Sequence, residues 1–224
     1  MAEPLVIDVV SDVVCPWCFI GKSRLEQALE LRPDIPVEVR YRPYFLNDWV
    51  PRDGISRDEY LTKKFGSPDR YKQIAGRVVQ AAKGEGLTYN PDKIARQPNT
   101  TDCHRLIMWA GNTGASAKMK QRLMELYFTE GADLTDRDVL VKAAAHCGMD
   151  AALTRELLAS DRDVDRVTQA AEQAKQPGID GVPCFIFGGV LAVSGAQDPA
   201  TLADAMARAA EEVEKRGSAA TAAE

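Results

Sequence analysis

The stretch from Ser11 to Cys18 reads SDVVCPWC and follows a nearly unbroken apolar run from Leu5 to Val10. Such a run is typical of a largely buried strand. Pro16 suits the first position of a helix, because the N–H that proline lacks would have no intrahelical partner there. The sequence therefore predicts a strand that leads into a helix, with Cys15 and Cys18 at the helix start.

A second strand is predicted after this helix. The helical spacing ends before Pro33, and apolar residues then alternate with charged ones from Val37 to Tyr41. This alternation is typical of a strand with one apolar face. A helix between two strands predicts a parallel pair with a right-handed crossover.

The long middle part of the chain, residues 51–176, has a helical pattern with few β-branched alternations. We expect an all-helical insertion here. The expected helices cover residues 58–65, 69–84, 101–110 and 116–129, with further helices up to about residue 176.

The strand pattern returns near the end of the chain. Cys184 to Phe187 and Val190 to Val193 flank the pair Gly188-Gly189, which predicts a β-hairpin. A last helix is expected from Pro199, and residues 217–224 are expected to form a flexible tail. The α/β core thus comprises residues 1–50 and 177–216, interrupted by the helical insertion.

Composition narrows the function classes. The 224 residues are 45% hydrophobic and 27% charged, which is ordinary for a globular chain, and the net charge is −5. A nucleic-acid partner held by phosphate neutralisation is therefore not expected, nor is a membrane span. The start of the sequence has no basic region typical of a secretory signal, so we expect a cytoplasmic protein, either monomer or homodimer.

The pair Cys15 and Cys18 points to redox chemistry. A thiolate attacks disulfides, and the amide groups at a helix start lower a thiol pKa. We expect Cys15 to be the attacking sulfur, exposed beside the flat ring of Trp17. Cys18 lies one turn further into the helix and is expected to be the more buried, resolving sulfur.

A zinc site is the competing interpretation. It needs about four ligands, whereas Cys15 and Cys18 supply two. Cys103-His104 and His146-Cys147 could nominally add more, but adjacent residues on a helix diverge by about 100°. We therefore expect no metal.

The remaining polar and cysteine side chains leave alternatives open. Cys103 and Cys147 fit helix-core positions, while Cys184 is either a packed strand cysteine or a third thiol near the redox pair. Three side chains could line a substrate groove between the core and the insertion: Asn99, His104 and Gln197. A lone histidine beside an apolar face, however, is usually structural. We list neither Asp8 nor Asp12 as catalytic.

Several motifs together resemble one known family. The segment at residues 11–22, SDVVCPWCFIGK, resembles the active-site helix of the thioredoxin-fold DsbA superfamily, in its cytoplasmic FrnE-like branch. Further segments resemble this family at residues 42–47, 99–100, 104–106, 181–183 and 193–197.

The resemblance implies a thioredoxin-like fold with a helical domain inserted between its two halves. It also implies a cis peptide bond between Val182 and Pro183, facing Cys15. A cis proline there would present backbone groups with which an extended peptide can pair as an added strand. Pro16, Trp17, Val182 and Pro183 are thus the expected neighbours of the redox pair.

The function expected first is a thiol–disulfide oxidoreductase that acts through a mixed disulfide. Its partners would be disulfide- or thiol-containing proteins or small molecules. No bound cofactor is expected, with glutathione as a conceivable co-substrate. The alternative is a glutathione-dependent isomerase or transferase of the kappa or 2-hydroxychromene-2-carboxylate isomerase type, which resembles the chain outside the active site but carries serine in place of Cys15. A third hypothesis is a binding module whose cysteines serve only as a sensor.

Overall fold

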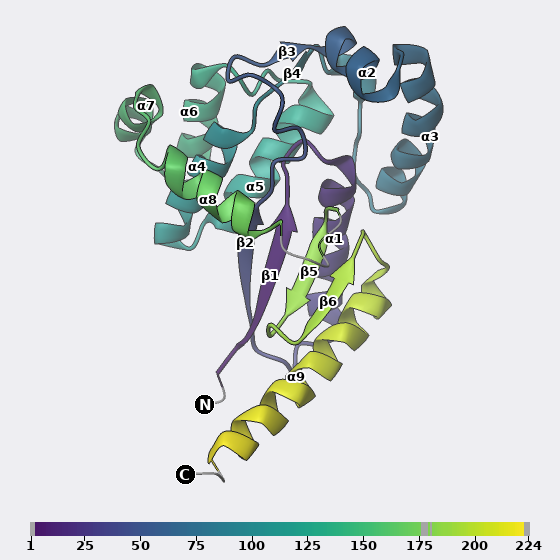
Figure 1. Ribbon diagram of the computed structural model, residues 1–224, viewed down its shortest axis with the longest axis vertical. Helices are drawn as coiled ribbons and strands as arrows, with labels where there is room; N and C mark the ends of the chain where they lie inside the picture. Colours follow the sequence, from purple (N-terminus) through teal and green to yellow (C-terminus); the bar gives the residue numbers. More distant parts are fainter. Residues whose placement is uncertain (1–2, 176–178, 180, 222–224) are drawn as a thin grey trace.

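The computed structural model describes residues 3–175, 179 and 181–221. Its core is formed by the two ends of the chain (Figure 1). The core elements are β1 (Leu5–Ser11), α1 (Pro16–Leu31), β2 (Val37–Pro43), β5 (Cys184–Phe187), β6 (Leu191–Ser194) and α9 (Pro199–Thr221). Every core strand and helix expected from the sequence is present.

The core sheet has the strand order β2-β1-β5-β6. β1 and β2 are parallel, with Leu5 opposite Val37, as the intervening helix predicts. β5 runs antiparallel to β1, with Val10 opposite Cys184, and forms a hairpin with β6. This register sets the residues just before Cys184 beside the loop that follows β1, where Cys15 lies.

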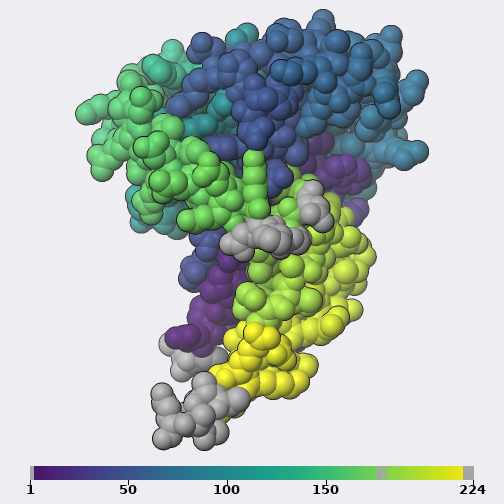
Figure 2. All heavy atoms as spheres, in the orientation of Figure 1, coloured from purple at the N-terminus to yellow at the C-terminus, as the bar shows by residue number. Residues whose placement is uncertain are grey.

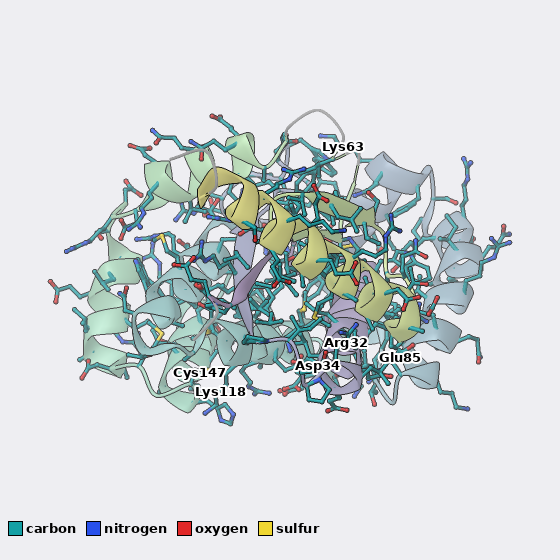
Figure 3. The ribbon with its side chains drawn as sticks, turned by 90° about the horizontal axis from the view of Figure 1, so that it is seen from below. Arg32, Asp34, Lys63, Glu85, Lys118 and Cys147 are labelled. Carbon is teal, nitrogen blue, oxygen red and sulfur yellow. The ribbon has the colours of Figure 1, made fainter. Side chains whose placement is uncertain are left out.

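α1 and α9 pack against each other and against the sheet. In the view from below, α9 crosses in front of the sheet (Figure 3). Their shared core consists of fully buried apolar side chains from the sheet and both helices, including Ile7, Phe185, Phe187, Leu25 and Met206. The sheet and α9 therefore hold α1, and with it the two cysteines, in a fixed position.

The insertion lies between β2 and β5 in the chain and forms the broad upper part of the molecule (Figure 2). Its helices are α2 (Arg57–Phe65), α3 (Pro68–Gly84), α4 (Thr101–Ala110), α5 (Ser116–Glu125), α6 (Arg137–His146), α7 (Ala151–Ala159) and α8 (Val164–Gln173). Short helical turns cover Pro91–Lys93 (η1), Gly111–Thr113 (η2) and Leu126–Glu130 (η3).

The expectation of an all-helical insertion is wrong in one detail. β3 (Ile55–Ser56) and β4 (Arg96–Gln97) form a two-stranded antiparallel sheet. Each strand is only two residues long, too short to produce the alternation by which a strand is recognised in a sequence. The α/β architecture with a helical insertion between its halves is confirmed.

The end of the chain is more regular than expected. α9 continues to Thr221, past Gly217, where the flexible tail was expected to begin. The expected return from insertion to core at residues 176–177, and residues 222–224 of the tail, lie outside the described residues. Among the residues that are described, no helix combines the length and apolar character needed to span a membrane.

Candidate active site

The redox pair sits at the start of α1. Cys15 is the N-cap residue, in extended conformation, and Pro16 takes the first helical position, as predicted. The carbonyl of Cys15 accepts hydrogen bonds from the N–H groups of Cys18 (2.9 Å) and Phe19 (3.2 Å). The first turn carries no acidic residue. The positive end of the helix dipole therefore acts on Cys15 without a compensating charge in that turn.

The two sulfurs are free thiols with opposite electrostatic environments. The Cys18 thiol donates a hydrogen bond to the sulfur of Cys15, and this bond, helped by the N–H groups of Cys18 and Trp17, lowers the pKa of Cys15 against the effect of burial. Burial raises the pKa of Cys18 well above its ordinary value. Cys15 is thus the stronger candidate for the thiolate and Cys18 for the protonated partner.

The exposure expected for Cys15 is wrong. Only 4% of Cys15 is accessible, against 1% of Cys18, whereas Trp17 is 40% exposed. The Cys15 thiol donates to the carbonyl of Val182 at 3.6 Å, so the segment before β5 covers part of the sulfur. Any molecule that reacts with Cys15 must displace some of this cover to reach its sulfur.

The Val182–Pro183 peptide bond is cis, as expected. The Pro183 ring lies against α1 at Gly21, where a Cβ atom would come within 2.9 Å of Pro183 Cγ. The absence of a side chain at Gly21 therefore lets the closing segment approach the helix and places the Val182 carbonyl beside Cys15.

Asp12 and His104 form a buried pair behind the active-site loop. His104 Nε2 lies 3.2 Å from Asp12 Oδ1, and both side chains are almost completely buried. The Asp12 carboxylate also accepts hydrogen bonds from the backbone N–H groups of Val13 (2.7 Å) and Leu46 (2.9 Å). His104 thus joins α4 of the insertion to the loop that carries Cys15.

The other two residues expected in the groove make local contacts. Asn99 donates to the Val50 carbonyl (2.8 Å) and accepts from the Thr101 N–H (3.0 Å), while Gln197 donates to the Ser194 carbonyl (2.9 Å). Asn99 lines a cavity of about 250 Å³, and His104 lines a different one. The three residues do not share either of these cavities, and their part in substrate binding stays a prediction.

The remaining cysteines are buried free thiols. Cys184 is fully buried beside Val10 and Ala174, and burial raises its pKa. Cys103 and Cys147 lie on the insertion side of the hydrophobic cluster that also contains Cys15 and Cys18, and burial raises both pKa values. Within the ranges that the structure describes, His, Cys, Asp and Glu side chains do not gather in a group of three or more that could hold a metal ion.

Sequence reasoning missed one residue, Lys120. It lies on α5 and is only 1% exposed, and its ammonium faces the ring of Tyr41 at 5.3 Å from the centroid. Its charge acts on Cys18, whose pKa it lowers. A signal was present, because Lys120 falls among Met119, Leu123 and Met124 on the apolar side of α5.

The site is a dithiol at a helix start, facing a cis-proline segment, in an α/β core that carries a helical insertion. Residues 6–207 match the model of the DSBA-like thioredoxin domain family. The chain belongs to this family of thioredoxin-fold, thiol–disulfide oxidoreductase-like proteins.

Individual relatives agree with this assignment. A probable DsbA oxidoreductase from Streptomyces coelicolor is 30% identical in sequence, with a TM-score of 0.84 over 93% of this chain and 91% of that one. The uncharacterised protein YwbO of Bacillus subtilis is 26% identical over 81% of this chain and 86% of its own length. A 2-hydroxychromene-2-carboxylate isomerase structure shares the fold, with a TM-score of 0.70, 15% identity, and coverage of 94% of this chain and 98% of that one.

Proposed function

We propose that this protein is a thiol–disulfide oxidoreductase of the FrnE-like branch, in which Cys15 attacks and Cys18 resolves. The observation that supports it most directly is the place of Cys15 at the N-cap of α1, one turn before Cys18, with its thiol donating at 3.6 Å to the carbonyl of Val182 in the cis Val182–Pro183 bond. The lowered pKa of Cys15 and the raised pKa of Cys18 are consistent with these two roles. Such a separation supports an attacking and a resolving role within one helical turn.

The reaction proceeds in two exchanges. The Cys15 thiolate attacks one sulfur of a substrate disulfide, so that a Cys15–substrate disulfide forms and the other substrate sulfur leaves as a thiolate. Cys18, once deprotonated, then attacks the sulfur of Cys15 and releases the second substrate sulfur. The substrate is reduced by two electrons and the enzyme becomes the Cys15–Cys18 disulfide. The reverse sequence oxidises a dithiol.

The surroundings of Cys15 favour a peptide or small thiol as the partner. Trp17 offers an exposed aromatic surface, and the backbone beside Pro183 can pair with an extended segment. We propose disulfide- or thiol-containing proteins or small molecules as substrates, with glutathione as a co-substrate. Five cysteines are an odd number and too few for a disulfide-stapled secreted scaffold, so the proposal includes the cytoplasm, with the protein a monomer or homodimer.

The isomerase alternative has less support. At 15% identity the 2-hydroxychromene-2-carboxylate isomerase shows the fold alone. A glutathione-dependent isomerase or transferase has no need of Cys18, whereas this site uses the Cys18 thiol to stabilise Cys15. Glutathione conjugation that survives Cys18→Ala while disulfide exchange is absent would favour the alternative.

Disulfide turnover with insulin as the substrate tests the proposal. Cys15→Ser removes the nucleophile, so we expect the rate of insulin reduction to fall to the uncatalysed rate. Cys18→Ser retains the nucleophile and should stop at one mixed disulfide per protein molecule. Cys147→Ala, in the core of the insertion, is the matched control and should keep the wild-type rate. Equal rates for wild type and Cys15→Ser would overturn the proposal, and the reduction potential of the pair gives the direction of electron flow.

A further inference from the structure

The buried pair of Asp12 and His104 is a polar contact between core and insertion that the proposed function leaves unexplained. Asp12 is fully buried and only 4% of His104 is exposed, with His104 Nε2 at 3.2 Å from Asp12 Oδ1. Burying a carboxylate is costly unless donors surround it. A pair that an apolar contact could replace at lower cost is therefore a candidate for a functional role.

Asp12 closes the turn that leads into α1. Its Oδ1 accepts the Val13 N–H at 2.7 Å, its Oδ2 accepts the Leu46 N–H at 2.9 Å, and its backbone carbonyl accepts the Cys15 N–H at 3.4 Å. The last of these is the bond that closes a four-residue turn. The turn ends at the N-cap of α1, where the Cys15 thiol meets the carbonyl of Val182. The place of the sulfur thus depends on the turn that Asp12 holds.

His104 brings a further hydrogen bond to this carboxylate from the insertion. It lies in α4, and its ring packs edge-on against Phe45 with the ring centroids 5.7 Å apart. Phe45 directly precedes Leu46, whose N–H the same carboxylate binds. A carboxylate that accepts two backbone N–H groups is in its ionised form and can only accept, so the ring nitrogen that faces it carries the hydrogen. His104 therefore holds both the turn before α1 and the segment after β2.

We propose that His104 is a positioning residue for Cys15: by donating its Nε2–H to Asp12, it holds the turn from Asp12 to Cys15 and keeps the sulfur at the helix start. This inference rests on the proposed function. His104 takes no part in the exchange of sulfurs and acts through Asp12.

Loss of this hydrogen bond has two effects on Cys15, both in the same direction. A looser turn weakens the alignment of the sulfur with the N–H groups and the dipole at the start of α1. The negative charge of Asp12, with one donor fewer, also acts more strongly on the thiolate nearby. Both effects destabilise the thiolate, and with it the reduced protein.

His104→Leu tests the inference through the reduction potential of the Cys15–Cys18 pair. The protein is equilibrated with mixtures of glutathione and glutathione disulfide, and the reduced fraction is read by acid-quenched alkylation and mass spectrometry. We expect the equilibrium constant for reduction by glutathione to fall about tenfold, which is a potential lower by about 30 mV. A merely structural role would destabilise the oxidised and the reduced protein alike and would leave this constant unchanged.

Two further substitutions separate the hydrogen bond from the volume of the ring. His104→Gln can place an amide N–H close to the position of Nε2, so it should keep the constant within about twofold of the wild type. The amide of His104→Asn is one methylene shorter and reaches only the position of Nδ1, so this variant should behave like His104→Leu. The comparison of His104→Asn with His104→Gln carries the test if circular dichroism shows His104→Leu to be unfolded.

His146→Leu is the matched control, because His146 is the other of the two histidines in the sequence and is exposed in the last turn of α6. It should keep the wild-type constant. Asp12→Ala tests the route of the effect. In that background His104→Leu should change the constant by less than about twofold, because the two substitutions remove the same interaction.

Three results would overturn the inference: a constant within about twofold of the wild type in both His104→Leu and His104→Asn, a constant that rises in these variants, or a His104→Gln protein that loses as much as His104→Leu. A full effect of His104→Leu in the Asp12→Ala background would overturn it as well. Failure of the proposed function looks different. In that case the wild-type protein itself would form no mixed disulfide with glutathione disulfide.

Discussion

One helical turn separates two thiols with opposite tendencies to ionise. Cys15 lies at the N-cap, where backbone N–H groups and the Cys18 thiol stabilise its anion, and these contributions exceed the cost of burial. Cys18 lies inside the helix, and burial dominates its environment. The proposed division into attacking and resolving sulfur thus rests on position in the helix rather than on residue type.

This asymmetry predicts the pH dependence of alkylation. Iodoacetamide reacts with the thiolate, so its rate with Cys15 should reach half its maximum at a pH below that of free cysteine, because the pKa of Cys15 is lowered. Cys18 and Cys103 should stay unmodified at neutral pH, because burial raises both pKa values. Peptide mass spectrometry after timed labelling between pH 5 and 10 measures all three.

The low accessibility of Cys15 reduces its absolute rate of alkylation but leaves the midpoint unchanged. The same lowered pKa stabilises the reduced protein above the pKa of the unfolded Cys15 thiol, and this contribution is lost as the pH falls through the folded pKa. Cys15→Ser lacks it. A Cys15 midpoint at or above that of free cysteine would contradict the assignment of the nucleophile.

Sequence reasoning at this scale succeeded where the information is local. The positions of Cys15 at the N-cap and of Cys18 one turn into the helix follow from Pro16 and the preceding strand. The partial covering of Cys15 depends on Val182, which lies far away in the chain, and the partners of Asp12 and Lys120 are set by how the insertion packs on the core. Contacts of this kind leave no periodic pattern in a single sequence.

Among the elements, the approach of α1 to the segment before β5 decides the geometry of the site. Gly21 faces Pro183 and Phe185 with no space for a side chain, whereas a Cβ atom at Gly76 of α3 would meet nothing within 4 Å. Both glycines lie in helix interiors. They form a matched pair for separating packing from helix propensity.

Gly21→Ala should destabilise the protein by about 1–3 kcal/mol, because the new methyl group overpacks a rigid proline ring. Gly76→Ala should stabilise it by about 0.5–1 kcal/mol, because alanine favours the helix and the site is open. Urea unfolding of the reduced proteins gives both free energies. A Gly21→Ala protein as stable as the wild type would show that the closing segment can move away from α1.

The elements that the sequence predicted well are marked by residues that start, end or turn the chain. The start of α1 at Pro16, the end of α4 at Ala110 and the hairpin of β5 and β6 all carry strong local signals. β3 and β4 carry no such signal, because each strand is only two residues long. Ile55 and Gln97 lie far apart in the sequence, so their pairing is visible only in the folded chain. The start of the tail was predicted wrongly. Glycine commonly marks the end of a helix, but α9 continues through Gly217 to Thr221.

For the molecule as a whole, core and insertion share one hydrophobic cluster. Cys18, Phe19 and Ile20 of α1 belong to the same cluster as Met119 and Leu123 of α5. The rings of Phe19 and Phe128 stack across this boundary with centroids 5.4 Å apart. The redox site thus lies on the contact surface between the two parts, and neither part buries its apolar surface alone.

This shared cluster predicts that core and insertion unfold together. Phe19→Ala should lower the free energy of unfolding by about 3–5 kcal/mol, since Phe19 is 3% exposed and leaves a cavity at the boundary. Hydrogen exchange followed by mass spectrometry should show protection falling equally in β1 and α5. Ile74→Ala, at a 44% exposed position on α3, is the control and should stay within about 0.5 kcal/mol of the wild type. If β1 lost protection while α5 kept it, the two parts would be separate folding units and the boundary would contribute little to stability.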